Sequence, residues 1–134
     1  MLIPVTLTAA AGAALINIWL SIRIGRLRTA HKISVGDGGN EALNRRMRAH
    51  LNFAENVPLV LVLIAALEIS GAGRLWGGAW LLPVAGLFLL GRIAHGLGMD
   101  GGAFGVGRMI GTLVTMLTQL ALAIVAVLVV AGKF

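Results

Sequence analysis

The chain has 134 residues, 58% of them hydrophobic and only 12% charged, and its mean hydropathy of +0.94 excludes an ordinary soluble domain. Four crossings of about 20 residues each nearly exhaust this length, so composition predicts one all-α integral membrane four-helix bundle, a single domain over residues 1–134. The formal net charge of +6 does not indicate nucleic-acid binding, because the basic residues flank apolar segments and are not interleaved with aromatic residues.

The first predicted span covers residues 2–24, and Asn17 and a few hydroxyl side chains are its only polar interruptions before the basic residues begin. We interpret it as a retained membrane helix and not as a signal peptide, because no basic residue precedes the apolar run and the positive charges follow it. Residues 34–40 are rich in glycine, aspartate and asparagine and predict a flexible connector. Asn40 or Asn44 is then the expected cap of the next helix.

The second predicted span, residues 42–70, carries a polar cluster at its start. Arg45, Arg48, Asn52 and Glu55 follow one another at spacings of 3, 4 and 3, which places them on one face of a helix. A charged side chain at the centre of a bilayer costs about 2.5–3.5 kcal/mol, so this face should turn toward the bundle interior or a wet cavity. Pro58 predicts a kink just beyond the cluster.

The third predicted span, residues 75–98, starts with two tryptophans that suit a membrane interface. Near its other end Arg92 and His95 lie at i, i+3 on one face. A glycine-rich connection leads to the fourth predicted span, residues 108–131, which Arg108 begins. These three side chains should therefore lie at the same membrane side as the polar cluster of the second span.

Basic residues are distributed unevenly between the two ends of this four-span arrangement. Arg74 and Lys133 fall at one end, and the other end has Arg23, Arg26, Arg28, Lys32, Arg45, Arg46, Arg48, Arg92 and Arg108. The positive-inside rule predicts that the basic end faces the cytoplasm and that both termini lie outside.

Six polar residues from three spans are predicted to converge near one membrane surface: Arg48, Asn52, Glu55, Arg92, His95 and Arg108. Several cations with one carboxylate and an amide can hold a small zwitterion that carries surplus negative charge. A small peptide with two carboxylates and one amine fits this set, and so does an anionic lipid headgroup.

A structural interpretation of the same residues is also open. Glu55 could pair with Arg48 or Arg92, while Arg45, Arg46 and the basic residues of the first connection anchor lipid headgroups. No metal site is predicted, because cysteine is absent and the three histidines lack paired ligand spacing.

Two motifs resemble those of a known family. Arg48-Ala-His-x-Asn52-x-x-Glu55, followed closely by Pro58, and Gly91-Arg-Ile-Ala-His95 are similar to signatures of the membrane-associated proteins in eicosanoid and glutathione metabolism, the MAPEG family. The resemblance includes the four-span layout and extends over nearly the whole chain.

The resemblance implies a homotrimer of four-helix bundles with glutathione as co-substrate, bound between neighbouring subunits near the cytoplasmic face. Arg48, Asn52 and Glu55 match second-helix positions that contact glutathione, and His95 matches a third-helix site position. Arg92 lies in the same motif, and we include it among the expected binding residues. Arg108 matches the arginine that stabilises the glutathione thiolate, which makes it the expected catalytic residue.

The chain departs from some family members at two positions. Met99 replaces a tyrosine, and Met109 follows Arg108 where the prostaglandin-forming members carry serine. Prostaglandin synthesis is therefore not expected. The leading hypothesis is a glutathione-dependent transferase or peroxidase that acts on hydrophobic electrophiles. The alternatives are a non-enzymatic membrane protein that binds an anionic lipid headgroup or acts as a scaffold, and a small exporter that uses Glu55 as a proton-coupled carboxylate.

Overall fold

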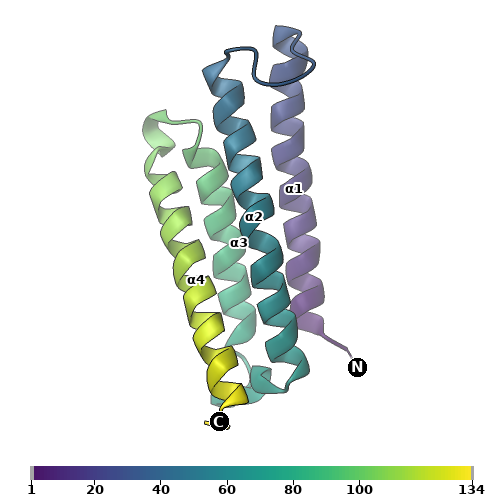
Figure 1. The fold of residues 1–134 in the computed structure, drawn as a ribbon, viewed down its shortest axis with the longest axis vertical. Coiled ribbons are helices and arrows are strands. Elements are labelled where there is room, and N and C mark those ends of the chain that lie inside the picture. The colour runs from purple at the N-terminus through teal and green to yellow at the C-terminus, as the bar shows by residue number, and fades with distance from the viewer. Residues whose placement is uncertain (1, 134) are drawn as a thin grey trace.

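Four long helices form the whole bundle in the computed structural model, which describes residues 2–133 (Figure 1). They are α1 (Pro4–His31), α2 (Glu41–Ile69), α3 (Leu81–Gly98) and α4 (Val106–Val130), with 3₁₀ turns at Ala72–Gly77 and Gly102–Phe104. No strand occurs within residues 2–133. All four helical segments are long and apolar enough to cross a membrane, so the predicted all-α, four-span bundle is confirmed.

Helix α1 continues past its predicted end at residue 24, because no proline interrupts residues 25–31. It ends at Lys32, whose backbone is left-handed (φ 56°) and whose N–H donates to the carbonyls of Arg28 and Thr29. Helix α2 begins after Asn40, one of the two expected caps. The Asn40 side chain accepts a hydrogen bond of 2.9 Å from the backbone N–H of Leu43.

The predicted start of the third span at residue 75 is wrong, since α3 begins at Leu81. Hydropathy continues through this stretch, but Gly77 and Gly78 have φ angles of 88° and 83°, which end any helix. The intervening 3₁₀ turn is fastened by the Trp80 indole, which donates to the carbonyl of Ala72 at 3.1 Å. Hydropathy therefore located the third span correctly but placed its start six residues too early.

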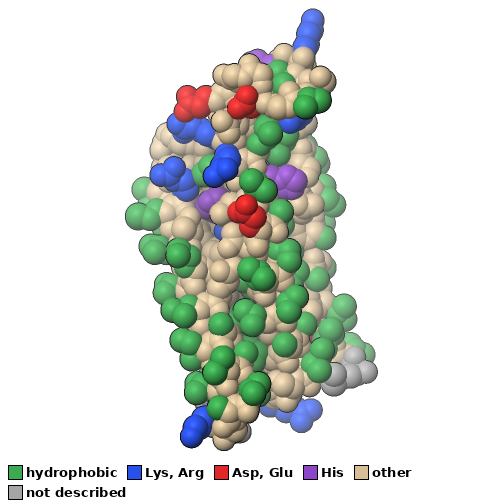
Figure 2. Space-filling view, viewed as in Figure 1, with side chains coloured by type: hydrophobic (Ala, Val, Ile, Leu, Met, Phe, Trp, Pro, Cys, Tyr) green, Lys and Arg blue, Asp and Glu red, His purple; other side chains and the backbone are tan. Residues whose placement is uncertain are grey.

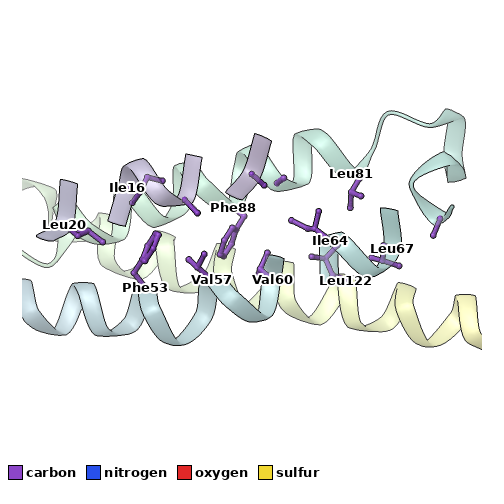
Figure 3. Packing of buried hydrophobic residues seen from close by; sticks show 14 residues of the cluster. Ile16, Leu20, Phe53, Val57, Val60, Ile64, Leu67, Leu81, Phe88 and Leu122 are labelled. Atoms are coloured by element: carbon purple, nitrogen blue, oxygen red, sulfur yellow. The ribbon is translucent and has the colours of Figure 1, made fainter. Parts of the chain in front are cut away.

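The apolar core lies between the helices, and α2 contributes the largest share of its residues (Figure 3). Phe53, Val57 and Ile64 of α2 are buried together with Phe88 of α3 and Leu122 of α4. Many large apolar side chains remain exposed on the outer surface, such as those along α4. A lipid-facing surface of this kind leaves close packing, and not exclusion of water, to hold the helices together.

Glycines bring α3 and α4 into close contact. A Cβ atom added at Gly107 would lie 2.5 Å from the carbonyl oxygen of Ala94, and one added at Gly111 would lie 2.4 Å from that of Gly91. The small-residue pair at positions 107 and 111 therefore serves packing within the chain. This contact fixes the first turn of α4, which carries Arg108, against the last turns of α3.

Candidate functional site

Most of the charged side chains, and the histidines, gather toward one end of the bundle, while a few basic side chains lie at the other end (Figure 2). This end holds the α1–α2 connection and the α3–α4 connection, while the two chain termini lie at the other end (Figure 1). The surface between the two ends is mainly apolar (Figure 2). The arrangement agrees with the predicted separation of basic and apolar residues along the chain.

Two adjoining hollows lie at the charged end, and we call them together the arginine groove. The first, of about 500 Å³, is lined by Glu41, Asn44, Arg45, Arg48 and Met99. The second, of about 380 Å³, is lined by Arg45, Gly98, Met99, Gly101, Gly105 and Arg108. Because both include Arg45 and Met99, the two hollows adjoin, and their linings together extend from the start of α2 to the start of α4. Each volume lies within the usual range for small-molecule sites.

The arginines of the groove differ in whether a carboxylate of the chain already pairs with them. Arg45 donates from Nε and Nη2 to Oε1 of Glu41, at 3.0 and 2.6 Å. Arg48 and Arg108 are exposed, and their side chains make no hydrogen bond or ion pair with any of residues 2–133. These two guanidinium groups are therefore available to an anion that enters the groove.

A polar layer lies in the bundle where α2, α3 and α4 meet. Arg92, only 1% exposed, donates to Oδ1 of Asn52 and to Oγ1 of Thr115, both at 2.7 Å. Gln119 of α4 donates to Oδ1 of Asn56 at 3.0 Å. These bonds replace the water that a bilayer interior lacks, so the layer holds three helices in register by polar contacts.

Two buried nitrogen atoms of this layer remain without a partner within residues 2–133: Nε of Arg92 and Nδ1 of His95. His95 is 4% exposed and lies one turn from Arg92 on α3. Neither side chain borders the two hollows of the groove. That they contact glutathione stays a prediction.

The six predicted site residues are therefore brought to one end but not into one cavity. Arg48 and Arg108 lie along the arginine groove, and Asn52 joins the groove's helix to the polar layer through Arg92. Glu55 is exposed and has no ion-pair partner among the described residues. The structural interpretation that pairs Glu55 with Arg48 or Arg92 is thus not what the isolated chain adopts.

Sequence reasoning missed several residues of the groove. Arg45 shares a helical face with Arg48, but it is not among the six predicted site residues, because anchoring of a lipid headgroup also explains its position. Met99 was noted only as a departure from some family members, and Gly101 and Gly105 carry no chemical signal in the sequence. Only the approach of the α3–α4 connection to α2, seen in the fold, brings them to the site.

Comparison with known proteins identifies relatives of this chain. The family model described as the MAPEG family matches residues 6–128. The chain is also similar to the inner membrane protein YecN of Escherichia coli strain K12 and to its counterpart in an O6:H1 strain. Each is 33% identical over 84 residues, which are 62% of this chain and 60% of the relative. The match thus spans less than two thirds of the curated relatives' length.

Proposed function

This chain belongs to the MAPEG family, which includes glutathione transferases and peroxidases, and on that premise we propose that it is a membrane-bound glutathione-dependent enzyme. It activates the glutathione thiol for attack on a hydrophobic electrophile dissolved in the bilayer. The observation that carries the proposal is the pair of unpartnered arginines, Arg48 and Arg108, at the two hollows of one groove.

The chemistry of the groove suits the peptide part of glutathione, which has two carboxylates and one ammonium group. Arg48 can hold a carboxylate through two parallel hydrogen bonds, and Asn44 offers an amide in the same hollow. Glu41, which pairs with Arg45, lines the first hollow, and Glu55 is an exposed carboxylate farther along α2; either can pair with an ammonium. Asn52 follows Arg48 by one turn on α2 and lines neither hollow; Arg92 holds its amide oxygen.

Arg108 has the role of stabilising the thiolate. A cysteine thiol has a pKa of about 8.5, and a nearby cation lowers it and so raises the thiolate fraction at neutral pH. Arg108 lies in the first turn of α4, where the positive end of the helix dipole adds to the field of its guanidinium. The chain has no cysteine, so a thiol must be supplied by another molecule, which we propose is glutathione.

Two reactions follow from a glutathione thiolate. In conjugation, sulfur forms a bond to an electrophilic carbon, and the leaving group departs with the electron pair of its bond. In peroxide reduction, sulfur attacks the peroxide oxygen, the O–O bond breaks and an alcohol leaves after protonation. The sulfenic form of glutathione then condenses with a second glutathione, giving the disulfide and water.

The apolar co-substrate can reach the groove from the bilayer. Met109, Ile110 and Leu113 follow Arg108 on α4 and are about half or more exposed. They form an apolar surface on the exposed side of α4, next to the turn that carries Arg108. Such a surface accepts many shapes, so we propose reactive lipids or foreign compounds as a class.

We also propose a homotrimer that is oriented with the arginine groove toward the cytoplasm. The exposed Glu55 supports assembly, because a carboxylate facing lipid costs about 2.5–3.5 kcal/mol and a neighbouring subunit would cover it. The excess of basic residues at the groove end supports the orientation. A location in the inner membrane follows the name of the relatives.

Calorimetric titration of reduced glutathione into the detergent-purified protein tests the proposal. We expect saturable binding that Arg48→Ala weakens strongly and that Arg74→Ala, the removal of an arginine at the opposite end, leaves unchanged. No binding by the parent protein, together with retention of anionic lipid through purification, would instead favour the lipid-headgroup function.

A further inference from the structure

Asp100 joins three helices at the charged end without lining the groove. Its Oδ2 atom forms an ion pair with Nη2 of Arg23 on α1, and its Oδ1 atom accepts from Nε of Arg46 on α2 at 3.1 Å. Asp100 itself follows the last turn of α3. One carboxylate therefore connects α1, α2 and the start of the α3–α4 connection.

Further bonds make this connection more than a surface ion pair. Arg23, 8% exposed, also donates from Nη1 to the carbonyl of Gly96 at 2.8 Å and stacks over the Trp19 ring at 4.7 Å. Arg46 donates from Nη1 to the carbonyl of Arg23 at 3.0 Å. Because both arginines are held by backbone atoms of other elements, Asp100 has a fixed position between them. We call Arg23, Arg46 and Asp100 the aspartate clamp.

The location of Asp100 is unfavourable for a lone carboxylate. The C-terminal end of a helix carries partial negative charge, which repels an anion. Two guanidinium groups offset this repulsion here. An acidic residue at this helix end therefore indicates that Asp100 holds the end of α3 in place against Arg23 and Arg46.

The aspartate clamp is continuous with the wall of the arginine groove. Met99 and Gly101, the two neighbours of Asp100, both line the second hollow. Gly101 has a φ angle of 83°, and a Cβ added there would lie 2.9 Å from Nη1 of Arg45. A Cβ added at Gly98 would lie 2.0 Å from the backbone nitrogen of Arg108. Any shift of Asp100 thus moves a wall that touches both Arg45 and Arg108.

We propose that Asp100 is a positioning residue that sets where Arg108 and the α3–α4 connection lie relative to Arg45 and Arg48. This inference rests on the proposed function in one respect: the position of Arg108 relative to Arg45 and Arg48 governs thiolate formation. The residue touches no substrate and acts through the backbone of positions 98–101.

The first test compares Asp100→Asn with Asp37→Asn in the full-length, detergent-purified protein. Asp37 is the matched control, because it lies in the α1–α2 connection at the same end and its carboxylate accepts from the Gly39 N–H. At saturating glutathione, we expect thiolate absorbance per bound glutathione to fall about tenfold in Asp100→Asn. Asp37→Asn should match the parent, and Asp100→Glu should restore part of the loss. A ratio that is unchanged in Asp100→Asn would overturn the link to thiolate formation.

A second measurement needs no glutathione. The chain has no cysteine, so spin labels can be placed at Ala42→Cys in the first turn of α2 and at Ala103→Cys in the α3–α4 connection, both exposed positions. Labelled chains are diluted with unlabelled ones so that distances within a chain dominate. We expect Asp100→Asn to broaden or shift the distance distribution and Asp37→Asn to leave it as in the parent.

The two measurements separate the inference from the proposed function. A parent protein that binds no glutathione overturns the proposed function, and the spin-label distance then decides the inference alone. An identical distribution in the parent and in Asp100→Asn overturns the positioning role.

Discussion

Gly98→Ala should disrupt the contact that positions Arg108. The new Cβ atom would lie 2.0 Å from the backbone nitrogen of Arg108 and 2.6 Å from the carbonyl carbon of Gly107. Real Cβ atoms essentially never approach within 3.0 Å, so the start of α4 must move by about 1 Å. No side-chain rotation can relieve the clash, since both atoms belong to the backbone. Overpacking costs about 1–3 kcal/mol, and we expect the upper end of that range.

Gly86→Ala is the matched control on the same helix. A Cβ at Gly86 meets nothing within 4 Å, so alanine should stabilise α3 by about 0.5–1 kcal/mol through its higher helix propensity. The two changes are chemically identical and are expected to have opposite signs.

The assay measures the free energy of unfolding by circular dichroism during titration with a denaturing detergent, and thiolate absorbance at saturating glutathione. Gly98→Ala should lower the free energy of unfolding through overpacking. It should also lower the thiolate absorbance, because a misplacement of about 1 Å can reduce the effect of a catalytic group about a hundredfold. If Gly98→Ala were as stable as Gly86→Ala and formed as much thiolate, the close contact between α3 and α4 would be refuted.

Glu68→Ala should lower the free energy of unfolding by about 1 kcal/mol. The Glu68 carboxylate accepts hydrogen bonds from the backbone N–H groups of Val5 and Thr6, each at 2.8 Å, and so caps α1. Proteolysis of the N-terminus should be faster in Glu68→Ala than in the parent protein, and equal rates would disprove the cap. Arg92→Met should cost about 1–3 kcal/mol in the same detergent titration, since Oδ1 of Asn52 loses its donor, and adding Asn52→Leu should recover most of that loss. Native mass spectrometry of the purified protein should give the mass of three chains, and a monomer would remove the explanation offered for the exposed Glu55.

Much of the fold could be predicted from the sequence because hydropathy and helix-ending residues have local causes. The capping side chain of Asn40 and the apolar run after Pro58 define α2 with little tertiary information. The start of α3 escaped prediction because Leu75 and Trp76 are as apolar as a span requires. The backbone separates them from the helix, because Leu75 is extended (ψ 153°) and Trp76 and the two following glycines are left-handed.

The candidate site was predictable as a set of residues and not as an arrangement. Helical spacing places Arg48 and Asn52 on one face, but it does not say which helix faces them or how deeply each lies. Arg92 and Arg108 look alike in the sequence, yet one is buried with two partners and the other is exposed. Asp100 finds its partner Arg23 at a sequence separation of 77 residues, a pairing that no local pattern reveals.

The ultraviolet absorbance of the glutathione thiolate in the presence of the purified protein tests the central claim most directly. The parent protein and Arg108→Ala are each titrated with reduced glutathione at neutral pH, and bound glutathione is measured in the same samples. The proposed mechanism predicts a thiolate signal in the parent that is lost in Arg108→Ala while most of the binding remains. An equal thiolate signal per bound glutathione in both proteins would contradict it.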